Sequence, residues 1–236
     1  MKYQNIVRAT FLRRPNRFIS HCLVETPMGE VEVIAHVKNT GRCEELLIEG
    51  VTVYLEYAPS ITRKTDYSLI AVMKGERLIN MDSQVPNKIV LEGLLSGQIV
   101  LPEVDGEIIS IKTEVKYGNS RFDLYVETAM SDKIFIEVKG VTLEEEGVAM
   151  FPDAPTIRGV KHVRELISAK DEGYKAFVIF IIQMSDVVYF TPNALRDPVL
   201  AEVLKQANEM GVEILAYDCH VTPTQITVDK AIKVLL

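Results

Sequence analysis

Three residues near the middle of the chain have the types and spacing that metal-assisted chemistry needs. Thirteen residues separate Asp123 from Glu137, and Lys139 follows Glu137 by two. Two neighbouring carboxylates can hold a hard cation such as Mg²⁺, and an adjacent ammonium can orient a nucleophile or stabilise developing charge. Because this spacing is loose, spacing alone favours a simpler interpretation, a solvated sheet face with a lysine–carboxylate pair.

These residues lie on a predicted β-hairpin. Apolar residues alternate along 120–126 and again along 133–139, and alternation is typical of strands. The short link between the two segments predicts antiparallel pairing. A register in which paired residue numbers sum to 260 brings the two apolar faces together. In that register Asp123 lies opposite Glu137, with Cβ atoms about 4.5–5.5 Å apart, and Lys139 shares their face.

The composition is that of an ordinary globular protein. The 236 residues are 47% hydrophobic and 25% charged, which predicts one large domain or two small ones. No apolar run reaches the ~18–20 residues of a membrane helix, and several arginines interrupt the N-terminal stretch where a signal peptide would lie. The three scattered cysteines predict neither a disulfide framework nor a zinc site. We therefore expect a cytoplasmic protein with no membrane contact.

Residues 1–82 are expected to form a small β-barrel, with the OB-fold as the leading candidate. Short strands separated by turn signals are typical of such barrels. The candidate strands are residues 6–12, 17–26, 31–37, 52–57, 67–74 and 77–81. A short helix is expected through residues 45–47.

A basic cluster accompanies this predicted barrel, although the whole chain has a formal net charge of −7. Phe11 and Phe18 are interleaved with its arginines, a combination that suits single-stranded nucleic acid. A solvated edge that discourages strand pairing explains the cluster equally well. The arginines that we assign to a nucleic-acid-binding surface are Arg13, Arg14, Arg17 and Arg42.

The second half of the chain predicts an α/β arrangement around the hairpin, after a linker near residues 82–86. Candidate helices cover residues 87–95, 156–170 and a segment that begins at Asp197-Pro198. Candidate strands cover residues 108–116, 176–183, 212–217 and, at an edge, 232–236. The segment 142–155 is expected to be a surface loop.

The helix that begins after Thr156 carries a polar face near its start. Arg158, Lys161 and His162 lie away from its apolar stripe, and basic groups beside a helix N-terminus can hold a phosphate. A solvated amphipathic helix is slightly favoured from the spacing alone.

Several of these motifs together resemble the sugar fermentation stimulation protein A family. They are Asn39-Thr-Gly-Arg42, Gly118-Asn-Ser-Arg-Phe-Asp123, Glu137-Val-Lys-Gly140, Phe151-Pro-Asp-Ala-Pro-Thr156, Arg158-Gly159 and Lys161-His162. The resemblance covers essentially the whole chain. It implies an OB-fold-like domain over residues 1–82 and an α/β domain of the PD-(D/E)xK nuclease type over residues 83–236. It also implies DNA binding and a link to sugar-utilisation genes.

The resemblance to PD-(D/E)xK nucleases implies a role for each residue of the central motif. Asp123, Glu137 and the carbonyl of Val138 would hold Mg²⁺ or Mn²⁺. Lys139 would position or activate the attacking water, and Glu114 is where such proteins often supply a further carboxylate. The chain departs from the nominal pattern in one place, because Phe122 replaces the proline before the aspartate.

Two functions of different classes follow from the sequence. One is a Mg²⁺-dependent nuclease, which the intact Asp, Glu and Lys favour. The other is a DNA-binding regulator of sugar-utilisation genes that keeps the fold without cleaving, as fold alone does not establish function. Both functions imply a nucleic-acid partner, with DNA favoured, and both are compatible with a dimer.

Overall fold

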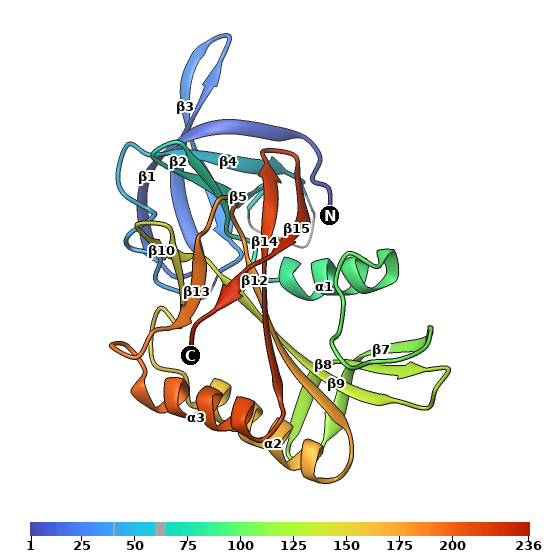
Figure 1. Cartoon of the computed structure of the whole chain (residues 1–236). Coiled ribbons are helices and arrows are strands. Elements are labelled where there is room, and N and C mark those ends of the chain that lie inside the picture. Colours follow the sequence, from blue (N-terminus) through green and yellow to red (C-terminus); the bar gives the residue numbers. More distant parts are fainter. Residues whose placement is uncertain (40, 60–64) are drawn as a thin grey trace. The chain divides into compact units, whose positions relative to one another are not determined.

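The computed structural model of the chain describes residues 1–39, 41–59 and 65–236. These residues form two compact units (Figure 1). The first unit contains Met1–Val85, Gln183–Ser185 and Cys219–Thr227. The second unit contains Pro86–Ile182, Asp186–Asp218 and Val228–Leu236. The expected boundary between domains near residue 82 stays a prediction.

The first unit is built on a sheet that closes on itself. Its strand order is β3-β2-β1-β4-β5-β6, and β3 also pairs in parallel with β5. Closure removes exposed strand edges, and Phe11, Cys22, Ala35, Leu55 and Leu69 fill the interior. The strands are β1 (Ile6–Asn16), β2 (Ile19–Thr26), β3 (Gly29–Val37), β4 (Thr52–Tyr57), β5 (Tyr67–Lys74) and β6 (Arg77–Asn80).

All six strands expected in this unit are present, with bounds that differ by a few residues. The prediction of a short helix through residues 45–47 is wrong. The N–H groups of Leu46 and Leu47 both bond to the carbonyl of Cys43, which makes a single turn. Thr40, in the motif Asn39-Thr-Gly-Arg42, lies outside the described residues.

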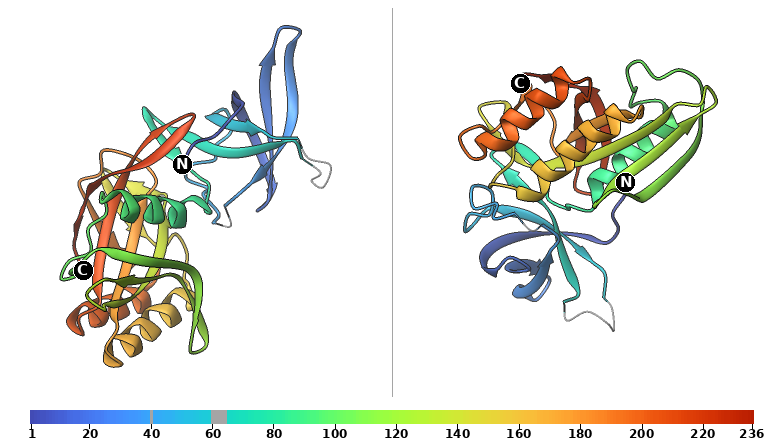
Figure 2. Two further views of the ribbon diagram at one scale, coloured as in Figure 1. Left: turned by 90° about the vertical axis from the view of Figure 1, so that its right-hand side faces the viewer. Right: turned by 90° about the horizontal axis from the view of Figure 1, so that it is seen from below.

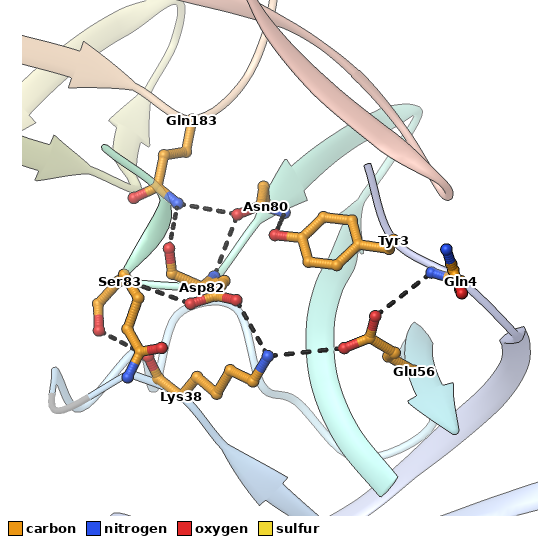
Figure 3. A network of polar contacts seen from close by, with 9 residues as sticks. Tyr3, Gln4, Lys38, Glu56, Asn80, Asp82, Ser83 and Gln183 are labelled. Atoms are coloured by element: carbon orange, nitrogen blue, oxygen red, sulfur yellow. Dashed lines mark hydrogen bonds and ion pairs between the residues drawn. The ribbon is translucent and has the colours of Figure 1, made fainter. Parts of the chain in front are cut away.

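A buried polar network crosses the first unit (Figure 3). The Nζ of Lys38 lies 3.3 Å from an oxygen of Asp82 and 3.6 Å from an oxygen of Glu56. The side-chain amide of Gln183 donates to Asn80 Oδ1 at 2.9 Å and to the carbonyl of Asp82 at 3.1 Å. Buried polar groups need hydrogen-bond partners. The side chain of Gln183 is such a partner for Asn80 and Asp82, which lie about a hundred residues earlier in the chain.

The second unit is built on a mixed sheet with the order β15-β14-β12-β9-β8-β7. β7, β8 and β9 are antiparallel neighbours, and β9, β12 and β14 run parallel. Its strands are β7 (Ile108–Tyr117), β8 (Ser120–Thr128), β9 (Lys133–Val141), β12 (Lys175–Ile182), β14 (Glu213–Thr222) and β15 (Gln225–Ala231), and the parts of β14 and β15 within Cys219–Thr227 are grouped with the first unit. As expected for a central strand covered on both faces, almost every side chain of β12 is buried.

Three helices accompany this sheet: α1 (Val85–Ser96), α2 (Ile157–Asp171) and α3 (Pro198–Glu209). α2 packs against β8, β9 and β12, and α2 and α3 lie side by side (Figure 2). α2 begins where expected, because Thr156 Oγ1 accepts a hydrogen bond from the N–H of Gly159. None of the described helices is long and apolar enough to cross a membrane.

A second, smaller sheet has the order β10-β11-β13-β16; it corrects one expectation, and its edge strand β16 agrees with the edge strand expected at residues 232–236. Its strands are β10 (Leu143–Glu145), β11 (Val148–Phe151), β13 (Tyr189–Pro192) and β16 (Lys233–Val234). Residues 143–151 of the segment 142–155, expected to be a surface loop, instead form the β10–β11 hairpin, where buried Glu144 accepts a hydrogen bond from the N–H of Gly147; residues 152–155 are in neither a helix nor a strand. The C-terminal strand joins this small sheet by pairing with β13.

Candidate active site

The β8–β9 hairpin positions the two carboxylates that the sequence singled out. Its pairs, Leu124 with Ile136, Tyr125 with Phe135 and Val126 with Ile134, confirm the predicted register. Leu124 is fully buried and alternates on β8 with the less buried Asp123 and Tyr125, so a slip by one residue would move it to the less buried face. The apolar alternation therefore fixes where Asp123 and Glu137 lie.

Asp123 is held by two donors, one from each of two elements. Its Oδ1 accepts a hydrogen bond from Asn87 Nδ2 on α1, and its Oδ2 accepts one from the N–H of Val138 on β9, both at 2.8 Å. Burial, followed by the negative charge of Glu137, raises the pKa of Asp123 above its ordinary value. The confirmed register places the two carboxylates on neighbouring strands, where like charges raise each other's pKa.

Glu137 is only 2% exposed, and its two oxygens have different surroundings. Oε1 lies 2.5 Å from Lys139 Nζ and 2.5 Å from His162 Nδ1. Oε2 is buried and has no hydrogen-bond partner. Burial alone would raise the pKa of Glu137, but the hydrogen bond from His162 and the charge of Lys139 outweigh burial and lower it. Glu137 is therefore an ionised carboxylate, one of whose oxygens is buried without a hydrogen-bond partner.

His162 reaches this site from the first turns of α2. Its ring is 5% exposed, and Arg158 Nε donates to its Nε2 at 3.4 Å. Because Nε2 accepts a hydrogen bond, the proton belongs on Nδ1, which donates to Glu137. The structure places the ring of His162 against Glu137, and its assignment to nucleic-acid binding stays a prediction.

The arrangement meets several requirements of a divalent-cation site. Carboxylate and carbonyl oxygens are the donors that hard cations prefer, and the free buried oxygen of Glu137 is a ligand atom without a partner. Neighbours that hold the ligand groups, as Asn87 and His162 do here, are typical of metal sites. No cluster of three or more His, Cys, Asp or Glu side chains able to hold a metal is found among the described residues, so a site here would also need backbone or solvent oxygens.

Glu114 is not brought to the carboxylate pair by any described contact. It lies on β7 with its side chain 58% exposed, and an oxygen of its carboxylate is 4.0 Å from a guanidinium nitrogen of Arg121. Its role as a further carboxylate stays a prediction. Asn87, which the sequence analysis did not single out, does reach Asp123, although it precedes Asp123 by 36 residues.

The four arginines assigned to a nucleic-acid surface all belong to the first unit, where one of them differs from the rest. The guanidinium of Arg14 donates to four backbone carbonyls, those of Arg17, Asn39, Gly41 and Arg42. Arg14 therefore has a structural role, because its side chain holds the backbone at these four residues.

The remaining three arginines are exposed. Arg13 bonds to Glu32 at 2.9 Å, and the guanidinium of Arg17 lies 6.0 Å from the ring centre of Phe18. Arg42 is also exposed. Whether these three bind nucleic acid stays a prediction.

Comparisons with known proteins cover both units. Residues 12–81 match the family described as the SfsA N-terminal OB domain, and residues 84–225 match the sugar fermentation stimulation protein RE domain. The expected fold class, an OB-fold followed by a nuclease-like α/β domain, is thereby confirmed, and the strand and helix order of the second unit agrees with it.

Similar proteins align over nearly the whole length. A sugar fermentation stimulation protein homolog from Ruminiclostridium cellulolyticum is 52% identical over 236 residues, which cover all of both chains. One from Desulfitobacterium hafniense (strain Y51) is 57% identical over 226 residues, covering 96% of this chain and 94% of the relative. The solved structure of Pyrococcus furiosus SfsA in complex with Ca²⁺ aligns with a TM-score of 0.86 at 32% identity, over 100% of this chain and 98% of that one.

Proposed function

The chain belongs to the sugar fermentation stimulation protein family, and from this premise we propose that it is a divalent-metal-dependent nuclease that acts on DNA. The observation that carries the proposal is Glu137 Oε2, a buried carboxylate oxygen without a hydrogen-bond partner. Leaving such an oxygen unpaired is unfavourable. A cation bound beside Asp123 would supply the missing partner.

Asp123, Glu137 and the carbonyl of Val138 would hold the ion, which we propose to be Mg²⁺ or Mn²⁺. Oxygen donors suit these cations, and the related Pyrococcus furiosus protein was solved with Ca²⁺, a cation with the same preference. When bound, the ion supplies Lewis acidity toward a phosphate oxygen.

Three further side chains would hold the metal ligands in place or stabilise charge on the substrate. Lys139 Nζ is 2.5 Å from Glu137 Oε1, so its ammonium lies at the site, where it can hold the attacking water and stabilise negative charge that develops on the phosphate. His162 and Asn87 would keep Glu137 and Asp123 in place through the hydrogen bonds described above. Both are positioning residues in this proposal.

The decisive test removes the ammonium and leaves the carboxylates. Lys139→Ala should keep the fold, metal binding and most DNA affinity, and it should reduce the cleavage rate by about 10²–10³-fold, the usual effect of losing one group that stabilises the transition state. The measurement is cleavage of duplex and single-stranded DNA with Mg²⁺, Mn²⁺ or EDTA. Lys133→Ala is the matched control, because Lys133 is an exposed lysine on the same strand.

Three outcomes separate the alternatives. Cleavage that needs the metal and disappears in Lys139→Ala supports the nuclease. A purified protein that binds DNA but cleaves neither DNA nor RNA with either metal would instead be the non-cleaving regulator of sugar-utilisation genes. Cleavage that survives Lys139→Ala unchanged would mean that the activity comes from another site or another protein.

A further inference from the structure

A cleft of about 760 Å³ opens in the second unit between the β7–β8 turn and the first turns of α2. His162 lines this cleft and also bonds to Glu137, so the cleft adjoins the carboxylate site. Four cationic side chains line it: Lys116 and Arg121 from the β7–β8 hairpin, and Arg158 and Lys161 from α2. None of the described residues that line it is acidic, although the chain as a whole has a net charge of −7.

Two of these cations oppose each other directly. Lys116 and Arg121 are cross-strand partners, because Tyr117 pairs with Ser120 across a tight turn. Gly118 adopts a φ of 52° in that turn, a left-handed conformation typical of such hairpin turns. Like charges directly opposed on neighbouring strands destabilise a sheet, and an anion bound between them would reverse that effect.

One residue that lines the cleft, Ser120, has a hydroxyl group with unused hydrogen-bonding capacity. Ser120 is 7% exposed, and its Oγ has no hydrogen-bond partner. A buried hydroxyl is normally paired. A group bound in the cleft would offer this hydroxyl an oxygen to which it can donate.

Existing contacts hold some of the cations without neutralising them fully. Lys161 Nζ donates to the carbonyl of Asn119 at 2.7 Å and lies 3.8 Å from Glu165. Arg121 is 4.0 Å from Glu114, and both side chains are more than half exposed. The exposed pair of Arg121 with Glu114 contributes little to stability, so a bound anion can displace it at small cost, whereas Glu165 is only 19% exposed and is expected to keep its pair with Lys161.

We propose that this cleft binds a phosphodiester group of a nucleic-acid strand, beside the group on which the carboxylate site acts. The proposal rests on the proposed function and adds Lys116, Ser120 and Arg121 to the residues that contact the substrate. The volume is that of a site for a nucleotide-sized ligand. Ile157, 90% exposed at the cleft, offers an apolar contact for a sugar, which inorganic phosphate lacks.

The test compares the salt dependence of binding in matched variants. The fluorescence anisotropy of a labelled DNA duplex is measured with EDTA at several salt concentrations, for the wild type, Lys116→Gln, Arg121→Gln and Ser120→Ala. Each cation removed should reduce the slope of log affinity against log salt by about 0.9. Ser120→Ala should weaken binding by about two- to tenfold and leave the slope unchanged, because only a neutral hydrogen bond is removed.

Lys112→Gln is the control, because Lys112 is also exposed on β7 but lies over the ring of Tyr125 and does not line the cleft. Thermal unfolding shows whether each variant is folded, and the midpoint of Lys116→Gln should not fall, since one of two opposed charges is removed.

Inorganic phosphate serves as a competitor, and the cleft should release the duplex only at phosphate concentrations far above those of the DNA.

The possible results distinguish this proposal from the proposed function. If the wild type binds DNA and both charge variants keep the slope of Lys112→Gln, the cleft proposal is overturned and the nuclease proposal stands. If inorganic phosphate binds while the variants leave DNA affinity unchanged, the cleft is a site for the free ion and the proposal is also overturned. If the wild type binds no nucleic acid in EDTA or in Ca²⁺, both proposals fail together.

Discussion

Asp123 and Glu137 are neighbouring carboxylates whose acidities the fold shifts in opposite directions. Burial and the charge of Glu137 raise the pKa of Asp123, whereas His162 and Lys139 lower the pKa of Glu137 against the effect of burial. Without a cation, the pair therefore favours one ionised and one more weakly acidic group. A divalent ion needs both carboxylates ionised, so ion and proton compete at Asp123.

This competition predicts that metal affinity rises with pH. At pH values below the raised pKa of Asp123, a metal ion must displace a proton to bind. Metal affinity should therefore increase by about tenfold for each pH unit and level off above that pKa. Calorimetric titration with Ca²⁺ between about pH 4.5 and 8, around the range in which most proteins are stable, measures the profile. An affinity that stays constant throughout this range would contradict the competition.

Asn87 provides the matched variant for this profile. Its amide donates to Asp123 and favours the ionised form, so Asn87→Ala should raise the pKa of Asp123 further and move the rise in affinity to higher pH. Asn208→Ala is the control, because Asn208 is exposed on α3, and its profile should coincide with that of the wild type.

At the scale of elements, Asp197 connects the starts of two helices. Its Oδ1 caps α3 by accepting a hydrogen bond from the N–H of Leu200 at 2.9 Å. Its Oδ2 accepts one from the N–H of Thr156, the N-cap of α2, at 2.8 Å. Because α2 carries His162, a single buried carboxylate fixes the start of the helix whose side chain holds Glu137.

Asp197→Ala should therefore lower the free energy of unfolding by about 1–3 kcal/mol, since it removes a cap and leaves a second donor unpaired. Asp197→Asn keeps an acceptor for the N–H of Leu200 and should lower the free energy of unfolding by less than Asp197→Ala does. Urea unfolding measures both. Asp171→Ala, at the exposed end of α2, is the control, and an Asp197→Ala variant as stable as this control would refute the capping role.

At the scale of the whole molecule, the basic cluster of the first unit divides into one structural and three exposed arginines. We expect Arg13→Gln, Arg17→Gln and Arg42→Gln together to reduce the salt slope of DNA binding by about one unit for each phosphate that is no longer bound. Arg14 is left in place, because its removal would free the carbonyls that it holds. Arg8→Gln, another exposed arginine on β1, is the control, and a triple variant that binds as this control does would exclude the cluster from binding.

The division of the chain also makes a prediction for the whole molecule. Limited proteolysis is expected to cut near residues 82–86, where Ser83 and Gln84 are exposed. The segment Gln183–Ser185 belongs to the first unit and bonds to Asn80 and Asp82. The cut protein should therefore elute as one particle in native size-exclusion chromatography and separate only in denaturant. Fragments that separate without denaturant would show that these bonds do not hold the first unit together.

Local patterns determined much of this protein, because they depend on residues close in sequence. The alternation of apolar residues around Asp123 and Glu137 specified the hairpin and its register, since a one-residue slip would turn the buried apolar side chains of β8 to its less buried face. Thr156 and Asp197-Pro198 specified two helix starts, because a cap bonds within one turn. The central strand was predictable from its continuous apolar run.

Only the tertiary structure decided which side chains surround those carboxylates. Asn87 and His162 lie 36 and 25 residues from their partners, and no local pattern encodes a contact formed by packing. The same holds for Arg14, whose charge suggested a phosphate but whose guanidinium binds carbonyls. The β10–β11 hairpin was missed because its glutamates suggested solvent, although Glu144 is buried. Polar residue types specify what a side chain can bond to, and burial by distant segments decides which bond it makes.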